Sequence, residues 1–99
     1  MKIPNNVKIG WRNYTVKMVE ERRDETGQVL DGEIDFVNHI IYVDKTQDSD
    51  EQIIAFLHEV VHGIFNAQCH SDWRDNEDLV EGISEGLFQL MKDNTKIFS

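Results

Sequence analysis

Residues 53–65 read IIAFLHEVVHGIF, and this stretch decides how the rest of the chain is interpreted. Its apolar residues recur with the period of an α-helix, so the pattern predicts a helix over residues 48–68. The apolar residues cover roughly half of the helical wheel, and His58 and His62 fall just beside them. The two histidines therefore lie at the border of the buried face, where the wall of a cleft is expected.

Residues 58–62 form an H-E-x-x-H motif. Residues four apart lie about one turn apart on the same face of a helix, so His58 and His62 can bind one metal ion. Glu59 lies about 100° round the helix from His58, close enough to reach a water on that metal. The motif predicts a zinc site with His58 and His62 as ligands and Glu59 as the general base. The plain alternative is a helix with surface or capping histidines.

Length and charge limit the classes of protein. The chain has 99 residues, which predicts one domain over residues 1–99. A net charge of −9 argues against a nucleic-acid surface and against an anionic membrane surface. The amino-terminal residues contain no apolar run, and no stretch has the length of a membrane span, so a cytoplasmic location is expected. The single cysteine, Cys69, excludes an internal disulfide and is expected to be a buried or idle thiol, with contact to the metal as the alternative.

Residues 1–47 have the alternating pattern of β-strands. Two strands are predicted within residues 7–18, joined tightly near Arg12-Asn13, and the charged residues 20–27 are predicted to form a solvated loop. Residues 32–44 predict a hairpin with its turn near Asn38-His39. We therefore expect an α+β fold with an antiparallel sheet of three or four strands, one face of which packs on the helices.

The remaining residues predict a polar loop over residues 69–76 and a second helix from about Glu77 to Lys92. The apolar stripe of this helix comprises Leu79, Val80, Ile83, Leu87, Leu90 and Met91. Two caps fit the first helix, Ser49 with Gln52 or Asp48 with Glu51, and either Asp75 or Asn76 fits the second.

A catalytic zinc site usually has three protein ligands and one open position, so a third ligand is needed. The helical wheel does not select it. The candidates are Glu77, Glu81, Glu85, Asp72, Asp75 and His70.

Residues 81–87, EGISEGL, resemble the second motif of the gluzincin metallopeptidases, the thermolysin-like group. That motif has a ligand Glu, a Ser three residues later and an acidic residue four residues later. The resemblance implies that Glu81 is the third zinc ligand and that Glu85 orients His58 through a hydrogen bond. The chain departs from the pattern at Val80, where the larger enzymes commonly have Asn.

The short chain is more similar to the small phage and ImmA/IrrE-type metallopeptidases, through the segments KIGWRNYTV, GEIDFVNHIIYVD, HEVVHGIF and LVEGISEGLFQLMKDN. This resemblance implies a minimal zincin-like fold, in which a sheet packs on an active-site helix and on a second, ligand-bearing carboxyl-terminal helix. In zincins the substrate pairs with an edge strand beside the active-site helix. Here that strand is expected to be residues 40–43, with Ile40 and Tyr42 as substrate-binding residues.

These observations predict a zinc-dependent metallopeptidase whose partner is a peptide or protein substrate, by analogy a phage or host regulatory protein. No motif identifies the residue that stabilises the oxyanion, and His39, Tyr42, His70 and Arg74 remain open. Two other classes compete with this one: a zinc-stabilised protein-binding module without catalysis, and a metal-free antitoxin or regulatory scaffold.

Overall fold

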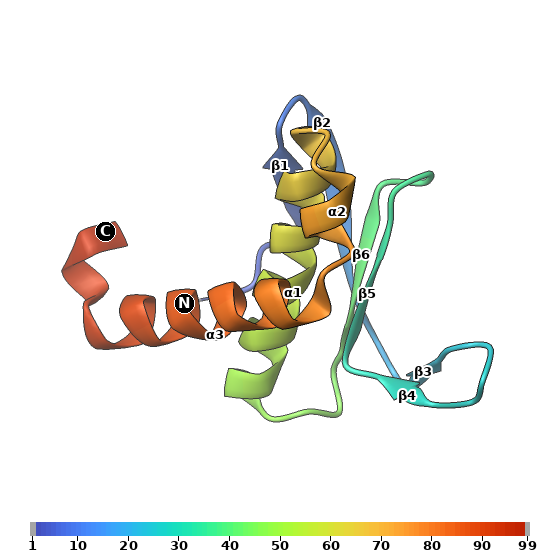
Figure 1. Cartoon of the computed structure of the whole chain (residues 1–99). Coiled ribbons are helices and arrows are strands. Elements are labelled where there is room, and N and C mark those ends of the chain that lie inside the picture. The colour runs from blue at the N-terminus through green and yellow to red at the C-terminus, as the bar shows by residue number, and fades with distance from the viewer. Residues whose placement is uncertain (1, 99) are drawn as a thin grey trace.

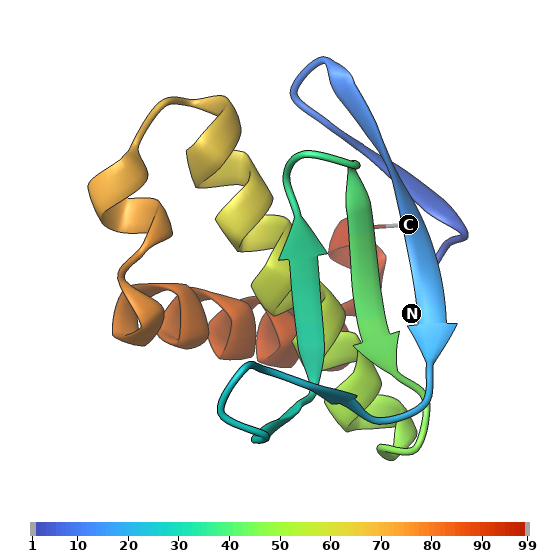
Figure 2. The same ribbon diagram turned by 90° about the vertical axis from the view of Figure 1, so that its right-hand side faces the viewer.

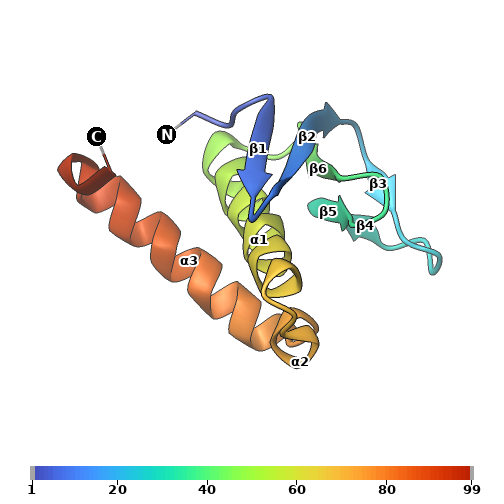
Figure 3. The same ribbon diagram turned by 90° about the horizontal axis from the view of Figure 1, so that it is seen from above.

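The long helix α1 (Ser49–Ala67) lies in the middle of three layers in this computed structural model, which describes residues 2–98. One side of α1 packs on a four-stranded sheet, and the other side is crossed by helix α3 (Glu77–Asp93) (Figure 1, Figure 3). The strands of the sheet are β1 (Asn6–Ile9), β2 (Arg12–Val19), β5 (Gly32–Asp35) and β6 (Ile40–Asp44). The predicted α+β class and both predicted long helices are confirmed.

The strand order is β1-β2-β6-β5, and the sheet is mixed. The β1–β2 and β5–β6 pairs are antiparallel, but β2 and β6 run in the same direction, as the arrows in Figure 2 show. The prediction of a fully antiparallel sheet is therefore wrong at this one junction. The alternation of apolar residues reports which face of a strand is buried and carries no information on its direction.

The segment between β2 and β5 explains the parallel pair. It is not the plain solvated loop that its charges predict, because β3 (Arg22–Arg23) and β4 (Val29–Leu30) pair with each other in a small ribbon. This ribbon lies at the end of the sheet where β2 finishes, so β5 starts from that end and runs back (Figure 2). The predicted turn near Asn38-His39 then brings β6 down beside β2.

Strand β6 is interior, which corrects the expectation that residues 40–43 form the edge of the sheet. Both sides of β6 are paired, so its backbone has no free groups for a substrate strand. Ile41 and Val43 are fully buried in the core beneath α1, and by alternation Ile40 and Tyr42 face the opposite side of the sheet. The edge strand on this side of the sheet is β5.

The turn between β1 and β2 lies at Gly10-Trp11, two residues before the predicted position. Gly10 has a φ of +62°, a conformation that glycine adopts without the strain that a Cβ would cause. Because the turn comes earlier, Trp11 leaves the alternating pattern and is 73% exposed.

The ends of the helices resolve the two open capping alternatives. The Asp48 side chain accepts a hydrogen bond from the Glu51 backbone N–H at the start of α1, and Asn76 accepts one from the Leu79 N–H at the start of α3. The predicted polar loop between them contains a short helix, α2 (Ser71–Arg74). A final 3₁₀ turn, η1, covers Thr95–Phe98.

The predicted apolar stripe of α3 is buried only in part. Val80 is fully buried, whereas Leu79 and Leu90 are 37% and 38% exposed. Because α3 crosses α1 obliquely instead of lying along it, one part of the stripe meets α1 (Figure 3). Among residues 2–98, no helix is long and apolar enough to cross a membrane.

Helix α1 lies close to the sheet at Gly63, immediately after His62. A Cβ at Gly63 would lie 2.9 Å from Ile9 Cδ1 and 3.3 Å from Ile34 Cδ1. Ile9 lies on β1 and Ile34 on the edge strand β5. The missing side chain therefore lets the histidine-bearing part of α1 lie directly on the sheet.

We predict that Gly63→Val destabilises the protein by about 1–3 kcal/mol, because the added atoms overpack this contact. Urea unfolding measures the difference. The control is Gly86→Ala on α3, where a Cβ meets no atom within 4 Å and helix propensity favours alanine by up to about 1 kcal/mol. A Gly63→Val protein as stable as the parent would contradict this account of the α1–sheet contact.

Candidate metal centre

His58 and His62 face one another across one turn of α1. Their ring centroids are 4.8 Å apart, and their Nε2 atoms are 3.2 Å apart. The side chains are 20% and 11% exposed, so both rings are largely removed from water while their Nε2 edges meet. This is the shared face that the spacing of the motif predicts.

The protonation of His62 is fixed by its second ring nitrogen. Nδ1 of His62 lies 2.6 Å from the backbone carbonyl oxygen of Arg74, at the end of α2. A carbonyl oxygen can only accept a hydrogen bond, so Nδ1 must carry the hydrogen and donate it. In the neutral ring this leaves a lone pair on Nε2, directed at His58, as metal-binding histidines require.

The Arg74 carbonyl is held in place by the Arg74 side chain. Nη1 of Arg74 donates to the Asn66 side-chain oxygen at 2.9 Å, which fastens α2 to the last turns of α1. Nε of the same guanidinium donates to the Asp75 carboxylate at 2.8 Å. The chain then continues through the capping residue Asn76 into α3, whose first residue is Glu77.

Glu77 completes a three-residue cluster with the histidines. Its Oε2 is 3.0 Å from His58 Nε2, and its Oε1 is 3.1 Å from His62 Nε2. Within residues 2–98, this is the one group of three or more potential metal-binding side chains whose donor atoms lie within 4.8 Å of one another. The cluster can therefore hold a metal ion.

The spacing of the two imidazole nitrogens fits a tetrahedral metal. Two ligands about 2.0–2.1 Å from a tetrahedral zinc ion lie about 3.3 Å from each other. The two Nε2 atoms are 3.2 Å apart, and His58 and His62 lie 3.0 and 3.1 Å from different oxygens of the Glu77 carboxylate. Two histidines and one glutamate are also a donor set that zinc takes in catalytic sites, where the fourth position is left open.

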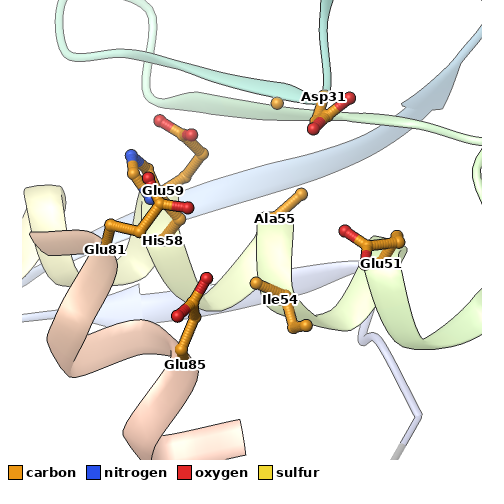
Figure 4. Close-up of a pocket in the computed structure, with 9 residues that line it drawn as sticks. Asp31, Glu51, Ile54, Ala55, His58, Glu59, Glu81 and Glu85 are labelled. Carbon is orange, nitrogen blue, oxygen red and sulfur yellow. The ribbon is translucent and has the colours of Figure 1, made fainter. Parts of the chain in front are cut away.

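Two sequence-predicted residues of α3 lie elsewhere. Glu81 and Glu85 line a second cavity beside His58, shown in Figure 4, and do not join the three-residue cluster. Among the described residues no hydrogen bond joins Glu85 to His58, whose Nε2 contacts Glu77 and His62. Cys69 is exposed and is likewise outside the cluster.

Glu59 is buried on the sheet side of α1, where it is only 7% exposed. Its carboxylate packs on Gly32 of β5, since a Cβ added there would lie 3.3 Å from Glu59 Oε2. Burial, together with the smaller effect of the negative charges of Glu77 and Glu33, raises the pKa of Glu59 to about 8. A divalent cation in the cluster would oppose the repulsion from Glu77 and lower this pKa.

A groove of about 450 Å³ runs between strand β5 and the histidine cluster. Its walls are formed by residues of β4 and β5, by α1 and by the start of α3, and they include Gly32, His58, Glu59, His62 and Glu77. The groove thus brings an edge strand, the three-residue cluster and the buried carboxylate of Glu59 to one place.

The four residues considered for oxyanion stabilisation do not line this groove. His39 contacts Tyr14 and Arg12, and the Tyr42 ring lies under the Arg22 guanidinium. His70 stacks on Trp73 at 3.9 Å between ring centroids, and the Arg74 side chain is bound to Asn66 and Asp75. Sequence reasoning missed Gly32 and the Arg74 carbonyl, and neither has a motif that could have identified it.

Comparisons with known proteins leave the site to be judged on its geometry. No protein-family model, no curated protein and no solved structure matches the chain.

The raised pKa of Glu59 predicts how the metal-free protein responds to pH. In the unfolded chain this carboxyl ionises near pH 4.5, and in the folded chain near pH 8. Between these values the unfolded state has released its proton and the folded state has kept it, so stability falls as the pH rises. At pH 7 the free energy of unfolding of the metal-free protein is lower by about 3 kcal/mol than it would be with a normal Glu59 pKa.

Glu59→Gln cannot ionise and should avoid this loss. We therefore expect the metal-free variant, in a chelator, to be more stable than the metal-free parent at pH 7 by up to about 3 kcal/mol. The two proteins should have similar stability near pH 4.5, because Glu59 is largely protonated in the parent there. Urea unfolding at both pH values measures this, and a variant less stable than the parent at pH 7 would show that Glu59 is ionised and stabilised in the fold.

Proposed function

We propose that this protein is a zinc-dependent metallopeptidase with a minimal zincin-like fold, in which α1 is the active-site helix and α3 carries the third ligand. The observation that supports the proposal most directly is the convergence of His58, His62 and Glu77, with the His62 tautomer fixed by the Arg74 carbonyl. A helix-borne histidine pair with an adjacent buried glutamate is an arrangement used in metal-assisted hydrolysis of peptides.

The chemistry divides between the metal and the chain. A zinc ion bound by these residues would supply a water of lowered pKa and polarise a peptide carbonyl. Glu59 would accept the proton of the attacking water and then deliver it to the leaving amine. Its place in the wall of the groove, beside His58, supports this role. The peptide would lie along the edge strand β5. The sequence indicates residues 40–43 of β6, but that strand is interior.

The identity of the third ligand is open between two neighbouring turns of α3. The contacts of Glu77 with both imidazoles support Glu77. The resemblance to the gluzincins supports Glu81, which lines the adjoining cavity. Both residues lie on the same face of α3, four positions apart, so the two proposals differ by one helical turn.

Metal content separates the two assignments. The untagged parent should bind one zinc ion per chain. His58→Ala should bind no zinc when protein and metal are mixed at equal concentrations. Glu77→Ala should weaken zinc binding by at least about 100-fold, more than the loss of an indirect partner. Elemental analysis and a zinc titration measure this. If Glu81→Ala loses zinc and Glu77→Ala retains it, Glu81 is the ligand.

Replacement of Glu59 tests the peptidase proposal. Glu59→Gln should retain zinc, because it removes no metal ligand, and should lose at least about 10²-fold in peptide hydrolysis, because glutamine cannot accept the proton. Peptide cleavage followed by mass spectrometry measures the loss. A variant that cleaves as fast as the parent would rule out Glu59 as the base.

A zinc-stabilised protein-binding module is the second candidate. It is favoured by the absence of His39, Tyr42, His70 and Arg74 from the groove, which leaves the predicted oxyanion stabiliser unidentified. Under this proposal the zinc-loaded parent would cleave no peptide, and the Glu59→Gln variant would bind partners as well as the parent does.

A further inference from the structure

A second cavity, of about 220 Å³, lies next to the metal centre and is ringed by carboxylates (Figure 4). Asp31 comes from the residue before β5, Glu51 from the first turn of α1, and Glu81 and Glu85 from α3. No lysine or arginine lines the cavity. Among residues 2–98, none of these four side chains takes part in an ion pair or a side-chain hydrogen bond.

The four carboxylates do not form a metal site. Of the described residues, only His58, His62 and Glu77 form a set of three or more ligands with donor atoms within 4.8 Å of one another. A metal ion needs its ligands at about 2.0–2.6 Å, so carboxylates spread round a cavity cannot share one. The charges therefore suit a larger, organic cation.

Glu59 gives an independent indication that a cation enters here. Its side chain lies in the wall that this cavity shares with the groove. It is only 7% exposed, yet no hydrogen bond or ion pair within residues 2–98 includes it. A buried carboxyl group without a hydrogen-bond partner is costly, and a cationic group that donates hydrogen bonds from the cavity would offset that cost.

The surface of the cavity distinguishes between two kinds of organic cation. Beneath the ring of carboxylates, the wall is formed by Ile54, Ala55 and Gly32. Lysine and arginine side chains combine an aliphatic stem, which packs on apolar surface, with a charged end that seeks carboxylates. A free amino terminus has the charge without the stem, so the cavity matches a basic side chain better.

We infer that this cavity binds a lysine or arginine side chain of the peptide, close to the bond that is cleaved. The inference rests on the proposed function, because it treats the adjoining groove as the peptide-binding groove. Gly32, His58 and Glu59 line both the cavity and the groove, so a residue beside the metal centre can extend its side chain directly into the ring of carboxylates.

Peptide binding to the zinc-loaded full-length protein tests this inference without requiring cleavage. The probes are pools of amino-terminally acetylated hexapeptides in which one position is lysine, arginine or the uncharged isostere norleucine. Binding is measured by fluorescence anisotropy, and the same pools are examined for cleavage by mass spectrometry. We expect the lysine and arginine pools to bind at least about tenfold more tightly than the norleucine pool, as several exposed charge pairs together would give.

Two variants locate the preference in the cavity. Glu51→Gln and Glu85→Gln should each reduce the preference for lysine over norleucine by about 2- to 5-fold. The matched control is Glu25→Gln, which removes the same charge from an exposed position outside the cavity and should leave the preference unchanged. Circular dichroism and zinc content confirm that each variant is folded and loaded.

Each outcome has one meaning. Equal binding of the lysine and norleucine pools overturns the inference, as does a preference that survives both cavity variants. Tighter binding of unacetylated peptides, regardless of side chain, overturns it in favour of an amino-terminal site. Cleavage without a preference for basic side chains supports the peptidase proposal and overturns this inference. A preference that depends on the cavity, without any cleavage, supports binding of a basic side chain and counts against the peptidase proposal.

Discussion

The central constraint is the convergence of His58, His62 and Glu77, whose ring nitrogens and carboxylate oxygens meet at one place. The two Nε2 atoms are 3.2 Å apart, and His58 and His62 lie 3.0 and 3.1 Å from different oxygens of Glu77. The Arg74 carbonyl prevents His62 from turning its hydrogen towards the others in the neutral ring. A proton or a metal ion in the centre can bind the lone pairs that meet there. In a 99-residue chain with a modest core, the free energy of metal binding would also become a noticeable part of the free energy of folding.

The position of α1 between two layers explains why one helix serves several purposes. Its sheet side is close-packed at Gly63, and Glu59 lies against Gly32 on the same side. On the side of α1 that faces α3, the two imidazoles contact Glu77. Because successive residues are about 100° apart, adjacent positions 58 and 59 face different neighbours and still line the same groove. A helix at the surface of a two-layer fold would leave one of these two positions in solvent.

Those features of the structure that depend on local periodicity could be predicted from the sequence. Both long helices, the histidine pair and the α+β class follow from the spacing of apolar residues and from one short motif. Strand direction does not, because alternation is the same in parallel and antiparallel strands, and so β6 could be taken for an edge strand. The Arg74 carbonyl is also invisible in sequence, since every residue has such a group. The choice among Glu77, Glu81 and Glu85 depends on how the residue 68–76 connection positions α3, which local periodicity does not determine.

Glu77, Glu81 and Glu85 illustrate why local rules and site geometry must be considered together. They recur every four residues on one face of α3, a spacing that places like charges next to one another and destabilises an isolated helix by about 0.2–0.5 kcal/mol per pair. Such a row is unfavourable unless cations lie beside it. Glu77 faces the proposed zinc site, while Glu81 and Glu85 face the cavity proposed for a basic side chain. Under both proposals the charge row on α3 has a cation at each end, so the feature that weakens the isolated helix becomes favourable when metal and substrate are bound.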